Sequence, residues 1–275
     1  MKTILLPTDY SETAKNAALY AFELAKQIGS TKIILYNAYQ APVAVDPSLP
    51  VMQLLNMDDI QRISEEGMKN FKNELASHAD ADIHVETLNE FAVLHSNIDD
   101  VCEHTRTDLV VMGITGGGGL EEVLIGSNTI NVVKHTKVPV LIVPAEAKYK
   151  QVKEIVLVCD YKKIDEAIPQ KQLKNILEAT KAKLFVLNID HNKDHANDLQ
   201  EAFGLDNALK DYAPEYHHVD KKDFAEAVNE FVANNEVDMI ITIPKKYGFF
   251  ESIFKRSHTK QLAYHTHVPL LCMHD

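Results

Sequence analysis

The chain of 275 residues has no tryptophan, only three cysteines, and far fewer basic than acidic residues. It carries 28 Lys and Arg against 40 Asp and Glu, which gives a formal charge of −12, and residues 1–148 account for most of it. Nucleic acids and anionic membranes bind to basic surfaces. The composition therefore argues against both as partners.

Cys102, Cys159 and Cys272 lie in apolar runs, with neither pairing nor metal-ligand spacing. We expect buried free thiols, as in a reducing cytoplasm. No long hydrophobic run is present at the N-terminus, where residues 4–6 are apolar and Pro7 follows at once. Such a run is too short for a signal peptide or a membrane span, so we expect a cytoplasmic protein.

Patterns typical of catalytic centres are also missing. The chain has no Ser-His-Asp order, no nucleophile elbow and no CxxC, and nothing marks a catalytic base. His217 and His218, like His265 and His267, lack the spacing of a convincing zinc site. We therefore expect no catalytic residues, no protein-bound metal centre and, at most, slow hydrolysis of a bound ligand.

What the chain does have is a regular alternation of strand and helix patterns, typical of an α/β fold. Continuous apolar strands separated by amphipathic helices predict a parallel sheet covered on both faces. In the first half the strands are expected at residues 3–6, 32–36, 82–85, 109–112 and 139–143. The helices are expected at about residues 11–29, 58–77, 97–104 and 128–134.

The second half repeats the first. Residues 153–161 match 2–10 at an offset of 151, and residues 237–273 match 107–143 at an offset of 130 without a gap. The repeat predicts two tandem domains, residues 1–147 and 151–275, joined by a short polar segment, so that the halves pack together.

A spaced set of small residues, Gly113, Gly116, Gly126 and Ser127, lies between a predicted strand and a predicted helix. Free backbone N–H groups at a helix N-terminus bind anions. The second copy has Ile243, Lys246 and Arg256 at the three glycine positions. We therefore expect that the scaffold does not itself require these glycines and that they serve a phosphate site. The alternative is a merely flexible glycine loop.

Two further features have competing interpretations. Asp9 ends the first strand, where it either caps the following helix or faces the adenine or ribose of a nucleotide, and the choice stays open. The motif His-Thr-x-Val-Pro contains His135 and recurs with His265 in the half that lacks the glycines, which favours a scaffold role.

The spacing G-x₂-G-x₉-G-S, the Pro-Thr-Asp strand end at Asp9 and the closing residues 138–143 resemble the nucleotide-binding branch of the universal stress protein family. The resemblance covers the whole chain as two family domains. It implies in each domain a five-stranded parallel sheet of order 3-2-1-4-5 with helices on both faces, and it implies ATP with Mg²⁺ between the first and fourth strands. The residues that it places at the nucleotide are Asp9, Ala38, Met112, Gly113, Gly116, Gly117, Gly126, Ser127 and Asn128.

The chain departs from the family pattern in two places. Gly117 stands where family members commonly have a basic or polar residue, and two glutamates follow at 121 and 122, which should weaken phosphate binding or raise its dependence on Mg²⁺. In the second domain the three replaced glycines should leave no room for ATP. The family's dimerisation through its last strand implies either a homodimer or an intrachain pairing of residues 138–143 with 268–273.

The leading hypothesis is a cytoplasmic ATP-binding stress-response protein that acts as a nucleotide-dependent switch. One alternative is a non-catalytic protein-interaction module with a vestigial nucleotide site. Another is a binder of a different small ligand, with the apolar residues of the 40–59 insertion (Met52, Leu54, Leu55 and Met57) as a lid. Those residues could equally pack over the domain seam.

Overall fold

A computed structural model describes residues 1–41, 56–114, 127–159, 169–189, 209–221, 223–243 and 268–273. The first half contains, in chain order, β1 (Thr3–Pro7), α1 (Glu12–Ile28), β2 (Lys32–Tyr39), α2 (Met57–Leu75), β3 (His84–Phe91), α3 (Leu94–Thr105), β4 (Leu109–Ile114), α4 (Ser127–His135) and β5 (Val140–Pro144). The second half contains β6 (Glu154–Cys159), α6 (Gln170–Thr180), β7 (Lys183–Ile189), the short 3₁₀ helix η2 (Lys210–Tyr212), β8 (Glu215–Val219), α8 (Phe224–Asn234), β9 (Met239–Thr242) and β10 (Leu270–Cys272).

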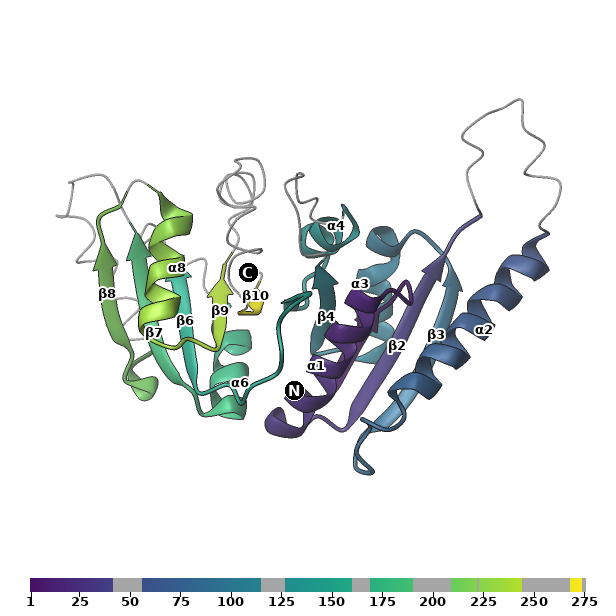
Figure 1. Cartoon of the computed structure of the whole chain (residues 1–275), viewed down its shortest axis with the longest axis horizontal. Coiled ribbons are helices and arrows are strands. Elements are labelled where there is room, and N and C mark those ends of the chain that lie inside the picture. The colour runs from purple at the N-terminus through teal and green to yellow at the C-terminus, as the bar shows by residue number, and fades with distance from the viewer. Residues whose placement is uncertain are drawn as a thin grey trace.

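The strands form one sheet of ten, in the order β3-β2-β1-β4-β5-β10-β9-β6-β7-β8 (Figure 1). The predicted α/β class is confirmed, and the order 3-2-1-4-5 is present within each half. The two five-stranded parallel sheets are joined because β5 and β10 pair in antiparallel orientation, with Leu271 opposite Leu141, within the intrachain pairing of residues 138–143 and 268–273 that the family resemblance implies. Both strands are apolar and mostly buried, so the pairing satisfies two edges that would otherwise be exposed. The domain boundaries at 147 and 151 stay a prediction.

Local sequence explains where α1 begins and ends. The side chain of Ser11 accepts a hydrogen bond from the backbone N–H of Ala14, which caps the first turn. Gly29 ends the helix with φ 69°, a left-handed conformation that glycine adopts at little cost. Because cap residues and an apolar stripe agree, this helix was predicted well.

The third strand was predicted less well. It was expected at residues 82–85 and lies at His84–Phe91. As an edge strand it is only half-buried along its length, and polar residues alternate irregularly with apolar ones. Its pairing with β2 from Lys32–His84 to Tyr39–Phe91 defines it. No run of apolar residues marks a strand that is held mainly by such pairing.

One pair of repeated residues has the same structural role in both halves. A carboxylate oxygen of Asp108 accepts hydrogen bonds from the backbone N–H groups of Lys2 and Thr3, at 2.6 and 3.1 Å. Asp238 does the same for Lys153 and Glu154, at 2.8 and 3.0 Å. Each aspartate therefore ties the start of the fourth strand of its half to the start of the first.

The segment between the halves is held by side chains of α1. The side-chain amide of Asn16 donates to the carbonyl oxygens of Pro144 and Ala147, both at 3.1 Å. Near the other end of the helix, Gln27 donates to the carbonyl oxygen of Val152 at 2.8 Å and accepts from its N–H at 2.9 Å. Because one apolar cluster also runs through both halves, they form a common core.

We predict that Asp108→Ala lowers the free energy of unfolding by about 1–2 kcal/mol, because two backbone donors lose a charged acceptor. The measurement is urea denaturation followed by circular dichroism. Asp100→Ala is the control, since this residue is exposed on the same half of the chain. Equal denaturation midpoints for the two variants would contradict the role assigned to Asp108.

Candidate functional site

The candidate site lies where β1 and β4 reach their carboxyl ends. The ladder between these strands pairs Ile4 with Leu109 and Leu5 with Val110, and then stops. Each of the two strands stays paired with its other neighbour: β1 pairs with β2 as far as Pro7, and β4 pairs with β5 as far as Ile114. A cavity of about 180 Å³ opens beyond the last paired residues. In open α/β sheets, ligands bind at this switch point.

Five of the nine predicted site residues line this cavity. They come from four separate segments: the β1–α1 turn, the end of β2, the end of β4 and the first turn of α4. The five are Asp9, Ala38, Met112, Gly113 and Asn128. Ser127 begins α4, but only its backbone is described. Gly116, Gly117 and Gly126 lie outside the described residues, as do Glu121, Glu122, Asp160, Lys246, Arg256, His265 and His267.

Asp9 is exposed and braces the turn before α1. Its Oδ1 accepts a hydrogen bond from the backbone N–H of Ser11 at 3.1 Å. The N-cap itself is Ser11, so the interpretation of Asp9 as the cap of this helix is wrong. Tyr10, between them, has φ 66°, and its hydroxyl donates to the carbonyl oxygen of Ser64 in α2 at 2.8 Å. The turn therefore presents Asp9 to the cavity from a constrained backbone.

Gly113 is a glycine because α1 passes too close to β4 for any side chain. A Cβ at this position would lie 2.5 Å from the carbonyl oxygen of Thr13 and 2.7 Å from its Cγ2. The expectation that the scaffold does not require the glycines is therefore wrong for Gly113. The equivalent Ile243 packs against the hydrophobic core of the second half.

The first turn of α4 is held over the cavity by a buried hydroxyl. The Oγ1 of Thr129 donates to the carbonyl oxygen of Gly113 at 3.2 Å, which joins the helix to the end of β4. The first N–H groups of a helix have no partner within it and carry partial positive charge. A ligand in the cavity would therefore meet backbone donors at this end.

Sequence analysis missed a polar network that fixes the opposite wall. Asn37 donates to the carbonyl oxygen of Thr8 at 2.7 Å and accepts from the hydroxyl of Ser64 at 2.8 Å, and Asn89 donates to that hydroxyl at 2.6 Å. Asn37 and Thr8 line the cavity. These residues come from separate elements with no common spacing, so no sequence signal could have grouped them.

Tyr36, another lining residue, was also missed. Its hydroxyl donates to a carboxylate oxygen of Glu90 at 3.1 Å and accepts from the amide of Asn97 at 3.0 Å. Burial raises the pKa of Tyr36 to about 12, so the phenol stays protonated at neutral pH. Its ring is a fixed apolar wall with a neutral polar end.

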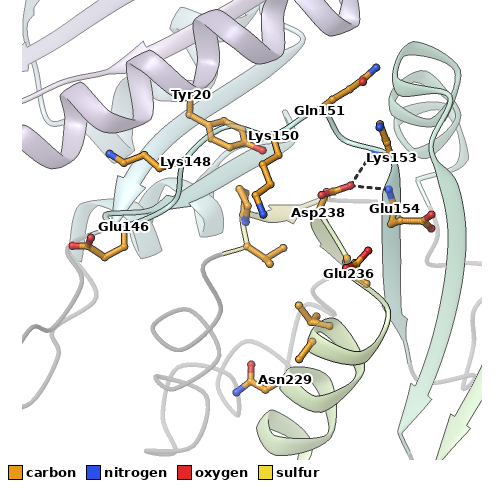
Figure 2. Close-up of a pocket in the computed structure, with 15 residues that line it drawn as sticks. Tyr20, Glu146, Lys148, Lys150, Gln151, Lys153, Glu154, Asn229, Glu236 and Asp238 are labelled. Atoms are coloured by element: carbon orange, nitrogen blue, oxygen red, sulfur yellow. Dashed lines mark hydrogen bonds between the residues drawn. The ribbon is translucent and has the colours of Figure 1, made fainter.

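A second, larger cavity of about 810 Å³ lies at the seam between the halves (Figure 2). Tyr20 of α1 reaches it from one side, Lys150 from the connecting segment, and Asp238 and Glu236 from the second half. The dashed bonds in Figure 2 show that Asp238 already accepts from two backbone donors. Lysines and carboxylates share its walls, so the charge selects no one class of ligand.

The described thiols are unsuited to chemistry. Cys102 and Cys272 are free and buried, as predicted, and burial raises the pKa of each to about 12. Since the thiolate is the nucleophile and the metal ligand, both are inert near neutral pH. The side chain of Cys159 lies outside the described set. Within the described part of the chain, no helix is both long and apolar enough to cross a bilayer.

We predict that Gly113→Ala destabilises the first half by about 1–3 kcal/mol, because the new methyl group overlaps the Thr13 backbone and forces α1 away from β4. Thermal or urea unfolding checks this. Ala38→Gly, a change of the same size at the cavity edge without a predicted overlap, is the control. A Gly113→Ala variant as stable as the wild type would show that α1 can move away from β4 without lowering the free energy of unfolding.

Comparison with known proteins identifies the family to which the sequence of the first half is similar. The model of the universal stress protein family matches residues 1–144. Universal stress protein MJ0531 of Methanocaldococcus jannaschii is 32% identical over 149 residues, which cover 54% of this chain and 84% of the relative. Universal stress protein MJ0577 of the same organism is 29% identical over 154 residues, covering 52% and 94%.

Over the whole chain, the crystal structure of a universal stress protein from Archaeoglobus fulgidus superposes with a TM-score of 0.71. It covers 99% of this chain and 98% of the other, at 17% identity. At that identity the likeness concerns the fold alone. It includes both halves, whereas the two sequence relatives match about half of the chain.

Proposed function

Because the chain belongs to the universal stress protein family, we propose that it binds ATP in the cavity of its first half and acts as a nucleotide-dependent switch in the cytoplasm. The observation that carries the proposal is the convergence of Asp9, Ala38, Met112, Gly113 and Asn128 on one cavity. These residues come from four segments separated by long stretches of chain, and they meet at the switch point of the sheet.

The chemistry of the cavity walls fits a nucleotide. At one end, Ala38, Leu94 and Met112 offer apolar surface to a base, and the Asp9 carboxylate can accept from ribose hydroxyl groups. At the other end, the first turn of α4 offers backbone donors to phosphate oxygens. Residues Gly116, Gly117, Gly126 and Ser127 complete the phosphate side of the proposed site.

Magnesium would enter with the triphosphate. Mg²⁺ in nucleotide sites keeps several waters and binds phosphates plus one or two carboxylates, so no all-protein cage is needed. Among the described residues no cluster of three or more metal-ligating side chains occurs. Asp9 is the one carboxylate among the described residues that line the cavity, and it lies at the proposed ribose end.

The proposed output of the switch is a surface that a partner protein or a second copy of the chain reads. ATP would bind against the first turn of α4 and fix this helix against β4. Hydrolysis would be slow at most, since efficient phosphoryl transfer needs a residue that positions the attacking group. In the second half we propose no ATP, because Ile243 packs into the core at the Gly113 position and Lys246 and Arg256 replace the other two glycines.

One observation favours the competing role as an interaction module. Phe91 at the end of the edge strand β3 and Val93 just beyond it are 53% and 43% exposed, and Tyr39 packs edge-to-face with Phe91, with ring centroids 5.8 Å apart. Exposed apolar groups on a sheet edge are typical of contact surfaces. Native mass spectrometry of freshly purified protein separates the roles, because a switch co-purifies with nucleotide and a vestigial site does not.

The third hypothesis, an apolar lid over a different small ligand, rests mainly on residues outside the described ranges. Of its four residues the structure describes Met57, which starts α2 and is 49% exposed.

We predict that the wild type binds one ATP per chain and that Gly116→Val abolishes binding, because the side chain occupies the phosphate path. Isothermal titration with Mg·ATP measures both. The matched control is Lys246→Val, the equivalent change in the second half, which should leave affinity and stoichiometry unchanged. Two ATP molecules per chain, or equal affinity in Gly116→Val, would remove the proposed site.

We also predict that Thr129→Val weakens ATP binding about tenfold, since the loss of its hydrogen bond to Gly113 frees the first turn of α4. Thr129→Ser keeps the hydroxyl and should restore most of the affinity. Thr259→Val, the same change in the second half, is the control for a general effect of the substitution. Titration of all three variants gives the comparison, and equal affinities would show that α4 needs no such tie.

A further inference from the structure

The two halves differ in how far their central strands pair. In the first half, β1 and β4 pair at two positions, Ile4–Leu109 and Leu5–Val110. In the second half, β6 and β9 pair at four, from Ile155–Met239 to Val158–Thr242. The sequence offsets of 151 and 130 make the first two pairs equivalent. The second half therefore continues the ladder across the place where the first half opens its cavity.

The directions of the backbone N–H and C=O groups on β1 identify the residue at which the ladder to β4 ends. On β1, the carbonyl oxygen of Thr3 accepts from Asp108 on the β4 side, whereas the N–H of Thr8 donates to Tyr36 on the β2 side. Alternate residues of a strand with neighbours on both sides point their backbone groups to opposite neighbours. Residue 7, like residue 3, therefore faces β4.

Residue 7 is proline, which has no backbone N–H to donate. The equivalent residue of the second half is Val158, which has one. The first half loses the ladder at the bond that this N–H would make, while Pro7 still pairs with Tyr36 through β2. Pro7 is buried and lines the cavity.

We propose that Pro7 is the residue that keeps the carboxyl ends of β1 and β4 apart, and that it is a positioning residue for nucleotide binding. This proposal rests on the proposed function of the same cavity, and it adds the reason why β1 and β4 separate there. A residue with an N–H at position 7 extends the ladder, as Val158 does, and narrows the cavity. In the second half the ladder is complete to Val158–Thr242, and Ile243 stands where the first half has Gly113.

The test is Pro7→Val in the full chain, with two independent measurements. Amide hydrogen exchange by NMR reports whether the new N–H of residue 7 is protected, which a ladder bond to β4 requires. Titration with Mg·ATP reports affinity, which we expect to fall at least tenfold while the unfolding midpoint stays equal or rises. A variant that gains stability and loses affinity is not explained by damage to the fold.

Val158→Ala is the matched control. It keeps the N–H and shortens a buried side chain, so it should lower the unfolding midpoint and leave ATP affinity unchanged. A freely exchanging amide at residue 7 of Pro7→Val would overturn the inference, and so would a protected amide with unchanged affinity. If the wild type binds no ATP, the proposed function fails, while protection of the residue 7 amide still decides whether Pro7 holds the strands apart.

Discussion

The arrangement of the first half depends on the close approach of α1 to β4. At Gly113 the carbonyl oxygen of Thr13 lies only 2.5 Å from the position that a Cβ would take, so helix and strand meet backbone to backbone. This approach brings the first turn of α1 to the cavity and gives Thr129 of α4 a carbonyl partner at the same point. Further along, the same helix holds the connecting segment through Asn16 and Gln27. One element thus contacts the candidate site, the seam and the second half.

The duplication separates scaffold from site within a single chain. Asp108 and Asp238 tie strand starts in both halves by equivalent pairs of hydrogen bonds, and each stands directly before an apolar strand. Residues at the cavity are repeated only in part, since Pro7 becomes Val158 and Gly113 becomes Ile243, whereas Asp9 and Ser127 recur as Asp160 and Ser257. Gly113 belongs to both classes, since packing against α1 requires it while its neighbours open the cavity. A residue that differs between the halves is therefore not by that fact a ligand contact.

Sequence reasoning succeeded where one signal determines one element. The cap at Ser11 and the left-handed Gly29 fixed α1, and the apolar runs of β1, β2, β4 and β5 fixed the central strands. It failed where structure depends on tertiary contact. The half-polar β3 is defined by its pairing with β2, the cap role offered for Asp9 belongs to Ser11, and the cause of Gly113 lies in a helix a hundred residues earlier. Of the nine residues proposed from the sequence, five line the cavity, whereas the wall made by Asn37, Ser64 and Asn89 depends on three elements that only the fold brings together.

Electrostatics sets a last constraint on what the cavity can hold. The chain has a charge of −12, and Asp9, the one acidic side chain among the described residues that line the cavity, is exposed. The overall field therefore repels a polyphosphate, and binding has to come from groups at contact distance. The α4 N-terminus is such a group, because its partial positive charge acts over a few ångströms and is little affected by remote charges screened by salt. A divalent cation would reduce the repulsion further, and it would do so only for ligands with adjacent phosphates. The proposed phosphate site would therefore favour metal-bound polyphosphates, including nucleotides, over anions without a bound cation, because the metal supplies the counter-charge that the acidic chain lacks.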